Sequence, residues 1–330
     1  MSTPRRLGGK KILISGGAGY LGANLASRLQ DTDCQVVLLG RSVVPASATG
    51  RARVETLQGD VRETATWERA LEGVDIVFHL AAQTSIYVAN REPSSDLKSN
   101  VVPMLNLLDV CRRRNLRPSI VFAGTVTEAG LPKRLPVDES PGDFPITVYD
   151  VHKWMAENYL KLYARMGMVR GASLRLANVY GPGPHSSSAD RGILNQMIRK
   201  ALKGEALTVY GAGQQIRDYV FVGDVVEAFL AAADRMEQVN GRHFVIGSGH
   251  GFRIVEAFEM VAERVADRTG MRVPVVHVEP PSALSPIEGR NFVADTSAFT
   301  EATGWTPAVF LAEGIDRTID ACLADAGSRT

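Results

Sequence analysis

The chain has 330 residues, which is enough for one large domain or two interleaved ones. Its 37 basic and 36 acidic residues leave a formal charge of +1, which excludes a general electrostatic attraction to nucleic acid or to an anionic membrane. The three cysteines are widely separated, with neither metal-ligand spacing nor a disulfide framework. We therefore expect no metal site, no membrane span and a cytoplasmic location.

The first predicted strand, over residues 11–15, leads directly into a glycine-rich turn and an amphipathic helix that reaches residue 29. The glycines of this turn satisfy both spacings of the dinucleotide fingerprint. Glycine is needed here because the backbone must approach a pyrophosphate closely, with the anion at the helix N-terminus. We therefore expect NAD or NADP to bind at Gly16, Gly19, Tyr20, Leu21 and Gly22.

The end of the second strand, over residues 35–39, bears on the choice between the two dinucleotides. A carboxylate at this point would bind both ribose hydroxyls of NAD, but the chain continues with Gly40, Arg41 and Ser42. An arginine without a carboxylate leaves room and countercharge for a 2′-phosphate, which favours NADP, although Arg41 could equally stack on adenine or point to solvent. After a third strand, Asp60 with Val61 is predicted to contact the adenine, or Asp60 to cap the next helix.

Further strands are predicted over residues 75–82, 119–125 and 171–176, with helices over 93–114 and 149–165 between them. Pro103 should give the first of these helices a kink or a late start, because proline removes a helix hydrogen bond. His79 lies within an apolar strand and is expected to be a core residue. The alternation of strands and helices predicts an α/β fold with a Rossmann-type, doubly wound parallel sheet, whose ligands bind at the carboxyl ends of the strands.

Beyond residue 176 the alternating pattern loosens, which predicts a smaller region interleaved with the sheet. We expect residues 1–176, with sheet strands returning from about 216–250, to form the dinucleotide-binding domain. Residues 177–215 and 251–330 would then form the substrate-binding region.

Tyr149 and Lys153 are four residues apart on a predicted helix, so their side chains share one face. A phenol is a poor acid or base at neutral pH, but an adjacent ammonium stabilises the phenolate and lowers the phenol pKa. The pair is a candidate proton-transfer device, although the same spacing is common on exposed helices.

Taken together, the motifs of this chain resemble those of the extended short-chain dehydrogenase/reductase family, in its nucleotide-sugar epimerase and dehydratase branch. The resemblance covers nearly the whole chain, and the motifs follow the family's order and spacing. It rests on residues 16–22, 59–62, 79–83, 100–101, 178–182, 217–220 and 304–305, and on Thr125, Tyr149 and Lys153.

The resemblance implies a role for each matching residue. Tyr149 would remove the proton of a sugar hydroxyl, Thr125 would hydrogen-bond the same oxygen, and Lys153 would hold the cofactor ribose. Asn178, Arg217 and Arg290 would hold the diphosphate of a nucleotide-sugar substrate, and Thr208 and Tyr210 would face its base. Further contacts are expected from Leu80, Ala81, Ala82 and Asn100 to the cofactor, and from Gln83 to the substrate.

Departures from the family pattern favour one class of reaction. Dehydratases carry an Asp-Glu pair directly after the catalytic threonine and decarboxylases keep a glutamate there, whereas this chain has Val126 and Thr127. A 4-epimerase and an NADPH-dependent 4-ketoreductase remain, and we favour the epimerase. A dinucleotide-binding sensor without activity is disfavoured because the three catalytic residues are present. The family also implies a homodimer, formed through the helices near residues 93–114 and 147–166.

Overall fold

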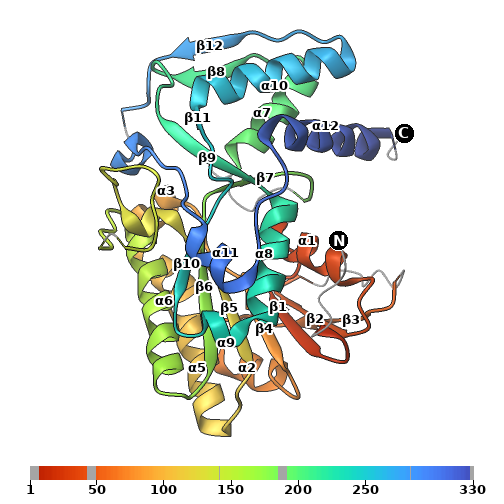
Figure 1. The fold of residues 1–330 in the computed structure, drawn as a ribbon, viewed down its shortest axis with the longest axis vertical. Coiled ribbons are helices and arrows are strands. Elements are labelled where there is room, and N and C mark those ends of the chain that lie inside the picture. Colours follow the sequence, from red (N-terminus) through yellow and green to blue (C-terminus); the bar gives the residue numbers. More distant parts are fainter. Residues whose placement is uncertain (1–6, 43–49, 141, 185–191, 283, 328–330) are drawn as a thin grey trace.

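The computed structural model of the protein describes residues 7–42, 50–140, 142–184, 192–282 and 284–327. Its centre is a seven-stranded sheet with the order β10-β6-β5-β4-β1-β2-β3 (Figure 1). Every neighbouring pair in this sheet is parallel, so the predicted doubly wound parallel sheet is confirmed. The strands are β1 (Lys11–Ser15), β2 (Gln35–Gly40), β3 (Arg53–Gln58), β4 (Ile76–His79), β5 (Ser119–Thr125), β6 (Arg170–Leu176) and β10 (His243–Ile246).

Helices cover both faces of the sheet because successive side chains of its strands point to opposite sides. In β1, Ile12 and Ile14 belong to one buried cluster, whereas Leu13 belongs to the other. The first cluster includes residues of α1 (Tyr20–Leu29), α8 (Val222–Asp234), α9 (Met236–Val239) and α11 (Ser297–Thr303). The second includes residues of α2 (Thr64–Ala70), α5 (Val102–Arg114) and α6 (Val148–Arg165).

The helix predicted over residues 93–114 is divided into two helices. α4 (Pro93–Asn100) has Val101 as its C-cap, and α5 begins at the next residue, with Pro103 in its first turn. Proline is tolerated there because the first backbone N–H groups of a helix have no intrahelical acceptor. Pro103 was expected to cause a kink or a late start; the helical stretch begins at Pro93 as predicted and is interrupted just before Pro103 instead. A further short helix, α3 (Ile86–Arg91), precedes α4.

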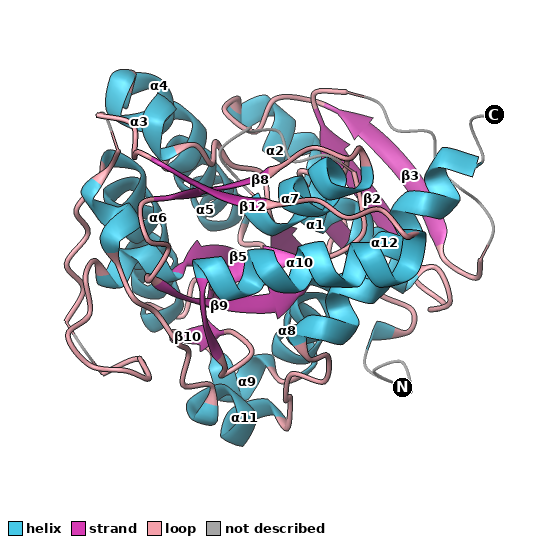
Figure 2. Cartoon of the chain, turned by 90° about the horizontal axis from the view of Figure 1, so that it is seen from above, coloured by secondary structure: helices cyan, strands magenta, loops and turns pink. Residues whose placement is uncertain are grey.

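A smaller region lies across one end of the large sheet and has its own buried cluster (Figures 1 and 2). It contains a three-stranded sheet, β11-β9-β7, and a two-stranded sheet, β12-β8. The bounds are β7 (Asn178–Tyr180), β8 (Leu207–Tyr210), β9 (Ile216–Phe221), β11 (Gly251–Arg253), β12 (Val275–Val278), α7 (Ile193–Leu202), α10 (Ile254–Thr269) and α12 (Leu311–Gly327). The division of the chain at residue 176 into two functional regions stays a prediction.

The short 3-10 helix η2 (Val126–Ala129) directly follows β5, and η3 (Pro286–Gly289) precedes α11. Among the described residues, no helix combines the length and the apolar character needed to cross a bilayer.

Candidate active site

The glycine-rich turn joins β1 to α1 and has no space for a side chain at Gly16, Gly17 or Gly22. Gly16 has φ +73°, and a Cβ at this position would lie 2.9 Å from Ala81 N. A Cβ on Gly22 would overlap the carbonyl oxygen of Gly16 and lie 2.8 Å from Gly17 Cα. Gly19 is the N-cap of α1 and brings no side chain to the helix end, so the first backbone N–H groups, including those of Tyr20 and Leu21, remain available to an anion.

The end of β4 is fastened to the end of β1 by the Ser15 hydroxyl. Ser15 Oγ accepts hydrogen bonds from Leu80 N at 3.2 Å and from Ala81 N at 3.3 Å. Its own proton therefore goes to His79 Nδ1, 2.7 Å away. Burial lowers the pKa of His79 to about 3 and keeps the ring neutral, so His79 is the hydrogen-bonded core residue that the sequence predicted. The small residues Ala81 and Ala82 thus leave the sheet beside the glycine turn.

The residues predicted to bind the adenosine part of the cofactor follow the ends of β2 and β3. Arg41 follows β2 and is exposed, and its backbone oxygen accepts a hydrogen bond from Gln58 Nε2 at 3.1 Å. Asp60 binds Arg62, whose hydrogen bond holds the pKa of the Asp60 carboxyl below its ordinary value, with a smaller contribution from the charge of Arg41. Asp60 does not cap α2, because the N-cap of that helix is Glu63. Val61 follows Asp60, and its carbonyl oxygen accepts from Trp67 Nε1.

The predicted catalytic residues come from β5 and α6. Thr125 is the last residue of β5, while Tyr149 and Lys153 lie one turn apart at the beginning of α6. All three side chains are buried. The Lys153 ammonium lies 4.0 Å from the centroid of the Phe122 ring, a cation–π contact that fixes its position beside β5.

Two side chains to which the sequence analysis gave no role connect the end of β5 to the start of α6. Thr127 Oγ1 lies 2.9 Å from Thr125 Oγ1 and donates a hydrogen bond to Asp150 Oδ1 at 2.5 Å. Asp150 directly follows Tyr149, so this bond holds the first turn of α6 against the end of β5. The available signal was an acidic residue next to the predicted catalytic tyrosine, on a helix that had to pack against the sheet.

A buried cluster of charged side chains, here called the Arg175 cluster, is hydrogen-bonded to the backbone of Thr125. Arg175 of β6 binds Glu157 of α6 through Nε at 3.0 Å and Nη2 at 2.6 Å, and Asp143 through Nη1 at 2.5 Å. Glu128 Oε2 lies 3.2 Å from Arg175 Nε, and Glu128 Oε1 accepts from Thr125 N at 3.0 Å. Thr125 and Glu128 therefore form a capping box on η2, a Thr-x-x-Glu pattern that was readable in the sequence.

A second buried network holds Asn100, predicted to contact the cofactor, and Gln83, predicted to contact the substrate. Asn100 Nδ2 donates to Gln83 O at 3.0 Å and to Asp96 Oδ1 at 2.9 Å. Gln83 Nε2 donates to Asp96 Oδ1 at 2.6 Å, and His152 of α6 lies 2.6 Å from Asp96 Oδ2. The network joins α4, α6 and the segment that leaves β4. It therefore links Gln83 and Asn100 to the helix that carries Tyr149.

The three residues predicted to hold a diphosphate are brought together in the smaller region. Arg217 of β9 donates to the backbone oxygens of Arg290 and Glu288, the latter at 2.6 Å. Arg290 Nη2 donates to Asn178 Oδ1 at 3.4 Å. Both arginines are buried, and burial lowers the pKa of Arg217. Two buried guanidinium groups beside one amide form an environment suited to an anion with two phosphate groups.

The residues predicted to face the nucleotide base lie elsewhere in the same region. Thr208 and Tyr210 are in β8, which pairs in parallel with β12 in the two-stranded sheet. The Tyr210 side chain is 51% exposed. The structure therefore places Tyr210 where a ligand could contact its ring. Tyr20, predicted to contact the dinucleotide, donates a hydrogen bond from its hydroxyl to Gly181 O at 2.9 Å.

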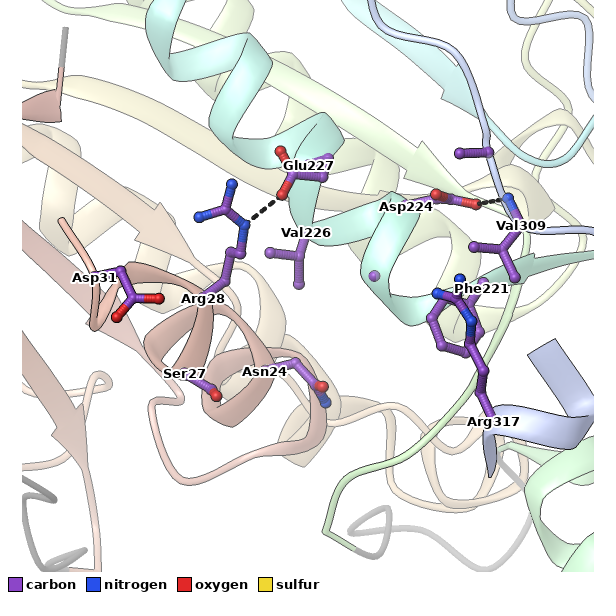
Figure 3. Close-up of a pocket in the computed structure, with 12 residues that line it drawn as sticks. Asn24, Ser27, Arg28, Asp31, Phe221, Asp224, Val226, Glu227, Val309 and Arg317 are labelled. Atoms are coloured by element: carbon purple, nitrogen blue, oxygen red, sulfur yellow. Dashed lines mark hydrogen bonds and ion pairs between the residues drawn. The ribbon is translucent and has the colours of Figure 1, made fainter. Parts of the chain in front are cut away.

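A separate hollow of about 520 Å³ lies between α1, α8 and the segment before α12 (Figure 3). None of the predicted site residues lines it. Three of its charged groups contact another lining group or the backbone: Arg28 pairs with Glu227 at 2.5 Å, and Asp224 accepts from Val309 N at 3.0 Å. Within the described ranges, no group of three His, Cys, Asp or Glu residues is arranged to hold a metal ion.

The chain is similar to known proteins over most of its length. A sequence model of the NAD dependent epimerase/dehydratase family matches residues 12–247. The putative UDP-glucose 4-epimerase of Methanocaldococcus jannaschii is 30% identical over 312 residues, covering 94% of this chain and 97% of that protein. UDP-glucuronic acid decarboxylase 3 of Arabidopsis thaliana is 31% identical over 317 residues, covering 92% and 86%. The crystal structure of the Thermus thermophilus UDP-glucose 4-epimerase in complex with NAD has a TM-score of 0.79 and 30% identity, covering 94% of this chain and 98% of the other.

Proposed function

Because the chain belongs to the NAD dependent epimerase/dehydratase family, we propose that it is a nucleotide-sugar 4-epimerase acting on UDP-sugars. The observation that carries the proposal is the hydrogen-bond chain from Thr125 through Thr127 to Asp150. It keeps the start of α6, with Tyr149 and Lys153, at the carboxyl end of β5. A sugar hydroxyl at this end of the sheet would meet Thr125 and Tyr149 together.

The packing of the glycine turn is suited to a bound dinucleotide. The glycine turn between β1 and α1 has no space for a Cβ at Gly16 or Gly22, and it directs backbone N–H groups toward an anion. When bound, the nicotinamide would supply a hydride acceptor and donor. Lys153 would hold the ribose, and Tyr149 would take the proton of the sugar C4 hydroxyl and later return it. Arg217 and Arg290 would hold the diphosphate and so orient the sugar.

Decarboxylation and dehydration are disfavoured by the residues that follow Thr125. Both reactions use an acidic side chain directly after the threonine, but Val126 and Thr127 occupy these positions. Glu128 does not substitute for such an acid, because its carboxyl is buried against Arg175 and accepts from Thr125 N. The similarity to a plant decarboxylase therefore supports the fold and the UDP-sugar class rather than the reaction.

Tyr149→Phe tests the assignment of the acid/base group. The phenylalanine keeps the ring but removes the proton carrier, so turnover of UDP-glucose to its C4 epimer should fall about 10²- to 10⁴-fold. Dinucleotide affinity, measured by calorimetry, should stay close to that of the wild type and serves as the control for folding. Near-normal turnover in Tyr149→Phe would reject the proposal.

A 4-ketoreductase is the second candidate, favoured by Arg41 in place of a carboxylate after β2. The two functions differ in what happens to the dinucleotide. Tightly held NAD that shows no net absorbance change during turnover supports the epimerase, whereas one NADPH oxidised per keto-sugar supports the reductase. NADP affinity that stays the same in Arg41→Ala would remove Arg41 from the cofactor site.

We also propose a homodimer formed through α4, α5 and α6. Leu97 of α4 and Val151 and Leu162 of α6 are apolar side chains exposed on these helices. Light scattering of the purified protein tests the proposal, because a monomer that does not associate at micromolar concentration would contradict it.

A further inference from the structure

The hydroxyl of Thr125 is the outer end of a hydrogen-bond chain that leads into the protein. Its Oγ1 lies 2.9 Å from Thr127 Oγ1, which in turn lies 2.5 Å from Asp150 Oδ1. Thr125, Thr127 and Asp150 are only 7%, 1% and 0% exposed. Bulk water therefore has little access to these three groups, and a proton on one of them exchanges most readily with its neighbour in the chain.

The chain has a direction because each hydroxyl carries only one proton. An ionised carboxylate only accepts, so Thr127 gives its proton to Asp150. Thr127 Oγ1 must then accept from Thr125, which leaves a lone pair of Thr125 Oγ1 for a hydroxyl outside the protein. Asp150 lies in the first turn of α6, at the positive end of the helix dipole.

We propose that Thr127 and Asp150 are positioning residues that give Thr125 a second proton path, parallel to Tyr149. The inference rests on the proposed function, because it requires a sugar hydroxyl at Thr125. The O–H bond of that hydroxyl breaks, and its electron pair stays on the sugar oxygen. Thr125 and Thr127 each accept one proton and pass on their own, and a new O–H bond forms on Asp150. The reverse transfer restores the sugar hydroxyl.

A purely structural clamp between η2 and α6 would use the same hydrogen bonds without moving a proton. Asp150→Asn separates the two roles, because an amide oxygen still accepts from Thr127 but does not take up a proton. Because the two paths are parallel, the test is made in Tyr149→Phe, in which the relay is the remaining proton path, and the same holds for the substitutions that follow. Adding Asp150→Asn to Tyr149→Phe should lower the residual kcat about 10- to 100-fold, while KM and dinucleotide affinity stay unchanged. A residual kcat equal to that of Tyr149→Phe alone would overturn the relay and leave only the clamp.

Substitutions of Thr127 keep the proposal falsifiable if Asp150→Asn does not fold. Thr127→Val has nearly the same shape but lacks the hydroxyl, so kcat should fall as in Asp150→Asn. Thr127→Ser restores the hydroxyl and should recover most of that loss. The matched control is Thr318→Val, which removes a buried hydroxyl bonded to Gly314 O in α12 and should leave kcat unchanged. Equal kcat in Thr127→Val and Thr127→Ser would contradict the relay.

The direction of the chain is testable without turnover. The infrared difference spectrum of aspartate-labelled wild type minus Asp150→Asn, at neutral pH, should show an ionised carboxylate for Asp150. A protonated carboxyl band would overturn the relay, because a protonated Asp150 could not take up the proton that the relay delivers. If Asp150 is ionised but the wild type does not convert UDP-sugars, the result contradicts the proposed function and not the direction of the chain.

Discussion

Replacing Glu157 with glutamine should lower the free energy of unfolding by about 3 kcal/mol at neutral pH, because Glu157 is the principal acid of the Arg175 cluster. Its carboxylate receives hydrogen bonds from Arg175 and from Lys161 Nζ, the latter at 2.6 Å, and its side chain is fully buried. A neutral amide leaves the buried guanidinium with less countercharge, and its NH₂ group turns one acceptor into a donor.

The magnitude follows from the pKa of Glu157. Burial by itself would raise this pKa, but the hydrogen bonds and charge of Arg175, with the charges of His243 and Lys161, outweigh burial and lower it to about 2. Relative to an ordinary value of 4.5, this corresponds to about 3 kcal/mol. Because the folded-state pKa is lowered, this stability is present above pH 4.5 and is lost as the pH falls toward 2.

Glu128→Gln is the matched control in the same cluster. Burial and the neighbouring charge of Glu157 raise the pKa of Glu128 well above its ordinary value, so the protonated acid is favoured. Glutamine resembles that acid and keeps an oxygen for Thr125 N, so we expect a loss below about 1 kcal/mol. A raised folded-state pKa means that Glu128 reduces stability as the pH rises above 4.5, and this decline should be smaller in the variant.

The assay is urea unfolding of the cofactor-free protein between pH 3 and pH 9, followed by circular dichroism. The expected result is a large loss at neutral pH in Glu157→Gln, a small loss in Glu128→Gln, and a smaller difference between Glu157→Gln and wild type near pH 3. If the two variants lose the same stability at neutral pH, our division of charge between the two glutamates is wrong.

Two further substitutions test the ligand-binding parts of the site. Gly22→Ala places a Cβ against the Gly16 carbonyl and should weaken NAD binding, measured by calorimetry, at least about 10-fold. The control Gly142→Ala, whose Cβ meets no atom within 4 Å, should leave NAD binding unchanged. Unchanged affinity in Gly22→Ala would contradict our proposal that the glycine turn binds the dinucleotide. Arg217→Lys replaces a guanidinium that reaches three backbone oxygens with a single ammonium, so KM for the UDP-sugar should rise about 10-fold without a change in NAD affinity. An equal loss of affinity for both ligands would indicate a folding defect instead.

The elements of the large sheet were predictable because each has a local cause. The apolar strands, the glycine turn and the spacing of Tyr149 and Lys153 are properties of short segments. Pro103 even marked the place where one predicted helix is interrupted. That Asn178, Arg217 and Arg290 lie close together was inferred only through the family resemblance. Arg290 and Asn178, which are hydrogen-bonded, are 112 residues apart in the sequence.

What the sequence did not reveal were the partners of buried polar side chains. Thr127 and Asp150 are 23 residues apart, and Asp96 and His152 are 56 residues apart, so their pairing depends on how α4 and α6 pack. A charged residue in a helix reads as a solvent-facing position unless its tertiary neighbours are known. The capping box of Thr125 and Glu128 was readable, but not that both residues are buried.

The connections between the large sheet and the smaller region restrict how the molecule can move. β6 ends at Leu176 and β7 begins at Asn178, so a single residue separates two different sheets, and β9 ends at Phe221 immediately before α8. The return from β10 to β11 is also short. A hinge needs a few flexible crossing points, but here several stiff strands and a helix cross the boundary. We therefore expect the distance from the paired arginines to Tyr149 to be set during folding. A nucleotide-sugar would then enter a binding site of nearly fixed dimensions, without inducing a closure of the two regions.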